Sequence, residues 1–147
     1  MQKPKIAFID DEPRILRSLK MHFRQSHDVF ITTDATELME YVSTNEVQVV
    51  ISDQRMPDKQ GTEVLSDIKA ASPNTIRILL TGYADLNAVM DSVNEGEIYR
   101  YITKPWQNDE LKKIVNKATE IAQQTQEITQ NSMKNDATQN RVNSGTV

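Results

Sequence analysis

Cysteine is absent from the 147 residues of this chain, which excludes disulfide bonds and thiolate metal sites and leaves the cellular compartment open. Histidine is scarce as well. His22 and His27 have neither a partner acid nor a second histidine at the spacing that metal ligands need. We therefore expect both histidines to be surface groups rather than ligands.

Long apolar runs and an excess of positive charge are also missing. No run approaches the roughly 20 apolar residues that a membrane-spanning helix needs, and the N-terminus has no signal-peptide pattern. The net charge is −4 and the pI is near 5.2, so we expect no direct binding of nucleic acid. These absences favour a cytoplasmic domain without membrane contact.

Short apolar runs alternate with helix-period patterns along most of the chain. Strands are expected at residues 5–9, 28–33, 47–53, 75–80 and 98–102. Pro13 suits the first position of a helix, and Asp34 followed by Glu37 resembles a capping box. Alternating strands and helices predict an α/β fold, in which a parallel five-stranded sheet is covered on both faces. The order 2-1-3-4-5 is the one we expect for a sheet of this size.

The most informative strand is the run from Val47 to Asp53. Its β-branched, apolar residues indicate a fully buried parallel strand, and the strand ends in a lone acid. A carboxylate at that position is costly to bury unless a cation lies beside it. On this stretch alone, Asp53 could equally cap the turn that follows.

Polar side chains at the ends of the other strands decide between these two interpretations. Asp10 and Asp11 follow the first strand, Thr81 the fourth and Lys104 the fifth. In the expected strand order the first and third strands are neighbours, so Asp10 and Asp11 should converge with Asp53. Converging carboxylates raise one another's pKa unless a cation lies among them, and an all-oxygen site suits Mg²⁺. With a lysine and a hydroxyl nearby, this set fits phosphoryl transfer to an aspartate.

Four short motifs carry a resemblance to a known family. Asp10-Asp11, Asp53 with Met56-Pro57, the Leu-Leu-Thr-Gly at 79–82, and Lys104-Pro105 resemble the receiver domain of two-component response regulators, over residues 4 to about 120. The resemblance implies a flavodoxin-like, doubly wound (βα)5 fold. It also implies a phosphorylation-dependent signalling switch, which catalyses its own phosphorylation and dephosphorylation and is not otherwise an enzyme.

The resemblance assigns the acceptor and the metal ligands. Asp53 would accept a phosphoryl group from a sensor histidine kinase or a phosphotransfer protein. Asp11, Asp53 and the backbone carbonyl of Arg55 would hold Mg²⁺ or Mn²⁺, and Asp10 would act through a metal-bound water.

The resemblance also assigns the switch. Thr81 and Lys104 would bind the phosphoryl oxygens, and Tyr101 matches the aromatic residue that turns inward when Thr81 moves. The bond between Lys104 and Pro105 would be a cis peptide. The face made by the fourth helix, the fifth strand and the fifth helix would then change and control an output domain, an effector or a homodimer.

Two segments indicate which subclass of receiver domains this chain resembles. Residues 53–57, Asp-Gln-Arg-Met-Pro, and residues 98–106 resemble receivers that are joined to HD-type cyclic-di-GMP phosphodiesterases or to hydrogenase-type transcriptional regulators. An output domain of such a type beyond the C-terminus is one partner that this resemblance implies.

Two side chains beside the acceptor are expected to tune the lifetime of the phosphorylated state. Arg55 lies two residues after Asp53, and Tyr83 lies two after Thr81. Neither can act as a base that orients water, Tyr83 could shield the phosphoryl group, and Arg55 could hydrogen-bond its oxygens. We therefore predict slow self-dephosphorylation.

The C-terminal part changes character. A heptad-like stripe passes through the positions Leu111, Ile114, Ala118, Ile121, Thr125 and Ile128. The stripe fits either a simple extended helix or a dimeric coil, because Ala118 and Thr125 are poor knobs. From Lys134 onward the composition is polar, which predicts disorder. We therefore divide the chain into a receiver domain at 1–122 and a helix extension with a disordered polar tail or linker at 123–147.

Two other functions compete with a phosphorylation switch. A pseudo-receiver would be a phosphate-independent interaction module, but such a module has no need to gather buried like charges. A Mg²⁺-dependent phosphatase of the haloacid dehalogenase type would need Asp-x-Asp after its first strand. Here Asp10 and Asp11 are adjacent, and adjacent side chains on an extended strand point in different directions.

Overall fold

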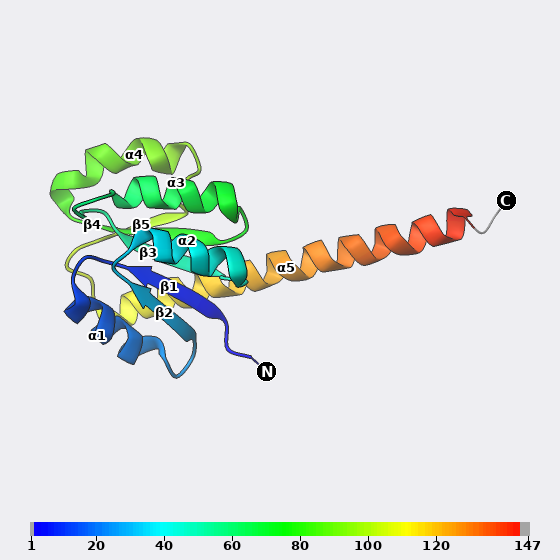
Figure 1. The fold of residues 1–147 in the computed structure, drawn as a ribbon, viewed down its shortest axis with the longest axis horizontal. Coiled ribbons are helices and arrows are strands. Elements are labelled where there is room, and N and C mark those ends of the chain that lie inside the picture. Colours follow the sequence, from blue (N-terminus) through cyan, green and yellow to red (C-terminus); the bar gives the residue numbers. More distant parts are fainter. Residues whose placement is uncertain (1, 145–147) are drawn as a thin grey trace.

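The computed structural model describes the backbone of residues 2–144, with the side chains of residues 2–129, 131 and 132. A single sheet of five parallel strands lies at the centre (Figure 1), in the order β2-β1-β3-β4-β5. The strands are β1 (Lys5–Ile9), β2 (Asp28–Thr32), β3 (Val49–Asp53), β4 (Ile76–Thr81) and β5 (Arg100–Thr103). The predicted fold class and strand order are both confirmed.

Helices cover both faces of the sheet. They are α1 (Pro13–Phe23), α2 (Ala35–Thr44), α3 (Gly61–Ala71), α4 (Leu86–Asn94) and α5 (Asn108–Ser144), with a short 3-10 helix η1 (Tyr83–Asp85) before α4. One core cluster joins the sheet to α1 and α5, and the other joins it to α2, α3 and α4. Within the described part of the chain, no helix is both long and apolar enough to cross a membrane.

Burial on both faces explains the apolar composition of the strands. On β1, Ile6 and Phe8 belong to one core cluster, and Ala7 and Ile9 to the other. Every residue of β3 is buried, because β3 pairs with β1 on one side and with β4 on the other, and helices cover both of its faces. The third strand is therefore central, as its run of β-branched residues predicts.

The helix starts follow local sequence rules. Pro13 opens α1, where its missing N–H costs nothing. Asp34 caps α2, since its Oδ1 accepts from the backbone N–H of Thr36 at 2.8 Å. At the start of α3, a Cβ on Gly61 would overlap the backbone carbonyl of Asp53. Glycine is thus required where α3 closes onto the end of β3.

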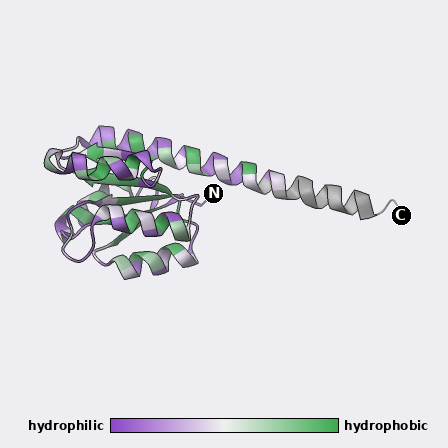
Figure 2. Ribbon diagram, turned by 90° about the horizontal axis from the view of Figure 1, so that it is seen from above, coloured by the Kyte–Doolittle hydropathy of each residue, from purple (hydrophilic) through white to green (hydrophobic). Residues whose placement is uncertain are grey.

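The fifth helix begins as a core element and continues beyond the domain (Figures 1 and 2). Leu111, Val115, Ala118 and Ala122 are buried, whereas Ile128 is 67 % exposed. The backbone remains helical to Ser144, so the prediction of a tail without regular structure from 134 differs from the structure. Once the first part of α5 is packed on the sheet, the costly nucleation step is complete. Each further residue can then extend the helix by one backbone hydrogen bond without contacting the sheet. Residues 145–147 lie outside the described part, and the division near 122 stays a prediction.

His27 corrects the expectation that both histidines are surface groups. Its side chain is 3 % exposed. Its Nδ1 lies 2.7 Å from the Ser26 hydroxyl and its Nε2 lies 3.2 Å from the hydroxyl of Thr119 on α5. Burial first, and the charge of Lys112 second, lower the pKa of His27. The covering helix comes from much later in the chain, so local spacing gives no sign of it.

Candidate functional site

Three carboxylates meet at the carboxyl edge of the sheet. Asp10 and Asp11 follow β1, and Asp53 ends the neighbouring strand β3, with Ile9 of β1 paired to Ser52. One oxygen from each carboxylate lies within 4.8 Å of the others. Asp10 and Asp53 are 2 % and 4 % exposed, and Asp11 is exposed. The convergence that strand order predicts is therefore present.

The electrostatics of this cluster favour a cation. Burial raises the pKa of Asp10 to about 6, the backbone N–H of Glu12 opposes that rise at 2.9 Å, and the charge of Asp53 adds to it. The Oδ2 atom of Asp10 is buried without a hydrogen-bond partner. An orphaned oxygen among acidic oxygens is the environment that a hard divalent ion such as Mg²⁺ would relieve.

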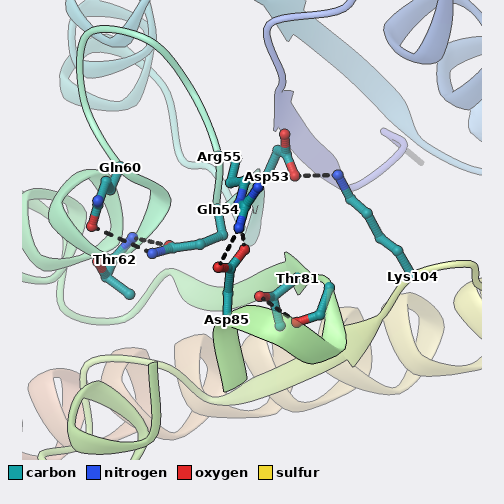
Figure 3. Close-up of polar contacts among 9 residues, drawn as sticks. Asp53, Gln54, Arg55, Gln60, Thr62, Thr81, Asp85 and Lys104 are labelled. Atoms are coloured by element: carbon teal, nitrogen blue, oxygen red, sulfur yellow. Dashed lines mark hydrogen bonds and ion pairs between the residues drawn. The ribbon is translucent and has the colours of Figure 1, made fainter. Parts of the chain in front are cut away.

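Lys104 reaches Asp53 from the end of β5. Its Nζ forms an ion pair with Oδ1 of Asp53 (Figure 3). Its backbone N–H donates to the carbonyl of Thr81 at 2.9 Å, which aligns the ends of β4 and β5. The following bond, to Pro105, is a cis peptide. Lys104 therefore places a positive charge directly against the buried carboxylate of Asp53.

Thr81 and Tyr101 lie on adjoining strands. Thr81 ends β4, is 1 % exposed and donates from its hydroxyl to the carbonyl of Gly82 at 3.3 Å. Tyr101 is half-buried on β5. It lines a groove of about 440 Å³ between α4, β5 and α5, together with Val93, Tyr99 and Trp106. The threonine thus belongs to the acidic site, and the tyrosine belongs to the neighbouring surface.

Gln54 is a buried residue of the site that sequence reasoning missed. It is 5 % exposed, its carbonyl accepts from the N–H of Gly61 at 3.0 Å, and its Oε1 accepts from the N–H of Thr62 at 3.0 Å. Its own N–H donates to the carbonyl of Leu80. Gln54 therefore holds the loop after Asp53 against both β4 and α3. A glutamine directly after a strand looks like an ordinary loop residue, so the sequence gives no signal for this role.

The loop residue Arg55 makes a second contact that sequence reasoning missed. Its Nε and Nη2 donate to the two carboxylate oxygens of Asp85 at 2.8 and 3.0 Å (Figure 3). Together with Asp53, Thr81, Lys104 and Tyr83, the pair lines a pocket of about 270 Å³. Tyr83 is 73 % exposed at the rim. The two predicted hydrolysis-tuning residues thus border the pocket, and Arg55 is directed to Asp85.

The arrangement suits one kind of chemistry. A buried carboxylate that opens onto a pocket can act as a nucleophile, and a lysine and a hydroxyl beside it can neutralise anionic oxygens. Fold and site together define an α/β domain with a buried, lysine-paired aspartate in an acidic cluster at its switch point. The family model of the response regulator receiver domain matches residues 6–116, and the chain belongs to this family.

The relatives agree with both predicted subclasses. The chain is 34 % identical over 115 residues to the hydrogenase transcriptional regulatory protein HoxA of Cupriavidus necator, and 32 % identical over 116 residues to HoxA of Bradyrhizobium diazoefficiens. These matches cover 78 % and 79 % of the chain and 24 % of each relative, so the chain spans about a quarter of their length.

A solved structure matches the other subclass. The signal receiver domain of an HD domain-containing protein from Pseudomonas fluorescens superposes with a TM-score of 0.79 at 34 % identity. The match covers 86 % of this chain and 94 % of that one. Receiver domains of two-component systems are phosphorylation-dependent switches, not members of a catalytic enzyme family, and they bind Mg²⁺ at an acidic pocket. They act with histidine kinases and output domains.

Proposed function

We propose that this chain accepts a phosphoryl group on Asp53 from the phosphohistidine of a sensor kinase or phosphotransfer protein. The observation that carries the proposal is the buried Asp53 carboxylate, paired with Lys104 and clustered with Asp10 and Asp11 beside a pocket. An Asp53 oxygen forms the bond to phosphorus while the phosphorus–nitrogen bond of the donor breaks, and the imidazole leaves with its electron pair. The product is an aspartyl phosphate.

A divalent ion completes the proposed site. Asp11, Asp53 and the carbonyl of Arg55 would hold Mg²⁺ or Mn²⁺, and Asp10 would act through a water molecule on the metal. The ion supplies charge neutralisation for the acceptor and the transferred group. The orphaned Oδ2 of Asp10 and its raised pKa support this assignment.

The remaining residues have roles around the transferred group. Lys104 and Thr81 bind its oxygens, and they are the nearest cation and a buried hydroxyl of the same pocket. When Thr81 moves toward the phosphoryl group, Tyr101 turns into the space that it leaves. The groove that Tyr101 lines then changes shape, and an output domain, an effector or a second copy of the chain reads that change.

Arg55 and Tyr83 control how long the phosphorylated state lasts. Both border the pocket from which a hydrolytic water would approach, and neither is a base that could orient it. We therefore propose slow self-dephosphorylation, with a partner protein resetting the state. By analogy with the relatives, an HD-type or transcription-activating output domain is the class of partner that we propose.

Labelling with a small phosphodonor tests the proposed function. In the presence of Mg²⁺, acetyl phosphate should add one acid-stable, base-labile phosphoryl group, measured as an intact-mass shift. Asp53→Asn or a chelator should abolish the shift, whereas Asp58→Asn, which changes an exposed acid of the same loop, should not. Failure of the wild-type protein to be labelled under these conditions would favour the phosphate-independent pseudo-receiver.

A further inference from the structure

The ion pair between Arg55 and Asp85 joins two loops of the acceptor pocket. Arg55 follows β3 and Asp85 lies in η1, and the two residues are 30 positions apart in the chain. The guanidinium meets the carboxylate through two parallel hydrogen bonds of 2.8 and 3.0 Å. This two-pronged geometry orients the planar arginine head and holds it toward the start of α4.

The pair lies where it would respond to charge on Asp53. Both partners line the same pocket as the acceptor, Lys104 and Thr81. The side chain of Arg55 is 76 % exposed and that of Asp85 is 21 % exposed, and exposed ion pairs are weak. A phosphoryl group brings nearly two negative charges and three strong acceptor oxygens into that pocket. It is therefore a competitor for the guanidinium within the same pocket.

We propose that Asp85 is a positioning residue that holds Arg55 away from the acceptor, and that phosphorylation of Asp53 transfers Arg55 from Asp85 to the phosphoryl oxygens. This inference rests on the proposed function of Asp53 and adds a regulatory contact to it. Asp85 competes with the phosphoryl group for one cation, so the pair biases the protein toward the unphosphorylated state. The two contacts are linked, and each weakens the other by the same factor.

The exchange also releases one end of α4. Asp85 directly precedes α4, whose only buried residue is Val89. The opposite end is anchored by Arg77, which is 9 % exposed and donates to the carbonyls of Glu97 at 2.7 Å and Gly96 at 3.2 Å. Loss of the pair therefore loosens the first turn of α4, where Leu86 is only partly buried against the core, while the loop after the helix stays fixed. The result is a pivot about the C-terminal end of α4.

Titration with fluoroberyllate, a phosphoryl mimic, tests the exchange. The protein contains one tryptophan, and Trp106 lines the groove of Tyr101, so its fluorescence should report binding in the presence of Mg²⁺. Asp85→Asn should tighten binding by about two- to fivefold, the range expected for an exposed ion pair. The control Asp91→Asn changes the charge of an exposed residue on α4 equally and should leave the affinity as in the wild type.

A double-mutant cycle makes the test specific. In an Arg55→Gln background, Asp85→Asn should have no further effect, because the competing cation is gone. Tightening that persists in that background would overturn the exchange, and so would an Asp85→Asn affinity equal to or weaker than that of the wild type. If wild type and Asp53→Asn both fail to respond to fluoroberyllate, the proposed acceptor function itself fails, which separates the two claims.

Hydrogen exchange provides an independent measurement of the pivot. On adding fluoroberyllate to the wild type, amides at residues 85–89 should lose protection, whereas amides at 96–98 beside Arg77 should keep it. In Asp85→Asn the first segment should already exchange faster without the mimic. Equal protection of residues 85–89 in all three samples would overturn the release of α4.

Discussion

At the residue scale, clustering the carboxylates lowers the stability of the fold at neutral pH, and the effect falls mainly on Asp10. Its folded-state pKa of about 6 lies above the ordinary value of 3.8, so the folded protein binds its proton more tightly than the unfolded chain. The stability that this proton contributes is present below pH 4 and is lost as the pH rises through 6. The loss is on the order of 3 kcal/mol.

Asp10→Asn should therefore stabilise the metal-free protein at neutral pH. An asparagine Oδ1 can still accept from the N–H of Glu12, and the repulsion with Asp53 disappears. In chelator, the variant should unfold at a higher urea concentration than the wild type at pH 7.5, and the difference should shrink toward pH 4. Added Mg²⁺ should stabilise the wild type more than the variant. A variant that is less stable than the wild type at pH 7.5 in chelator would contradict the claim that ionised Asp10 destabilises the metal-free fold.

Arg55 and Tyr83 make a second prediction at this scale, on the lifetime of the aspartyl phosphate. Arg55→Asn and Tyr83→Ala should each accelerate its decay, because each opens the pocket to water. A tenfold faster rate requires an activation barrier lower by only about 1.4 kcal/mol, which one side chain can supply. The measurement is the decay of the phosphorylated mass after removal of the donor. If both variants decay no faster than the wild type, the shielding idea is wrong.

Residues differ in how far the sequence predicts them. Asp10, Asp11 and Asp53 could be placed together because parallel strands deliver their ends to one edge, and the strand order follows from connection rules. The contact of Arg55 with Asp85 could not be predicted in this way, since it depends on the conformations of two loops and of the long arginine side chain. His27 was missed for a related reason. Its ring contacts Thr119 of α5, which lies 92 residues further along the chain.

At the scale of elements, the start of α3 fixes the position of Asp53 at the end of β3. Gly61→Ala would place a Cβ against the backbone carbonyl of Asp53 and the side chain of Leu79. We expect a loss of about 1–3 kcal/mol in the free energy of unfolding, and a slower phosphorylation rate, because the end of β3 must shift. Gly82→Ala is the matched control, since nothing lies within 4 Å of its added Cβ.

Urea unfolding and the initial rate of labelling by acetyl phosphate measure the two effects. Equal stability of the Gly61→Ala and Gly82→Ala proteins would contradict the close packing of α3 on β3.

The sequence predicted the helices and strands more completely than it predicted side-chain contacts. Pro13 and the capping Asp34 marked helix starts correctly, because both act through local backbone geometry. The length of α5 was harder to predict. A helix that extends through backbone hydrogen bonds alone needs no apolar stripe, so a polar sequence gives no signal for it.

At the scale of the whole molecule, the site and the groove of Tyr101 should communicate through Thr81. Thr81→Ala should leave labelling of Asp53 largely intact, because the acceptor and Lys104 remain. The same change should reduce the response of Trp106 fluorescence to fluoroberyllate, since the hydroxyl that would move is missing. Association with an output domain or second copy that depends on phosphorylation should weaken in parallel. A full fluorescence response in Thr81→Ala would contradict this route.

The central claim is that Asp53, and neither Asp10 nor Asp11, carries the phosphoryl group. Reduction of the labelled protein with borohydride converts an aspartyl phosphate to homoserine, and peptide mapping then locates the converted residue. We expect homoserine at position 53 in the wild type, and none in Asp53→Asn or in protein treated with chelator before the donor. Homoserine at position 10 or 11 of the wild type, with Asp53 unchanged, would contradict the assignment.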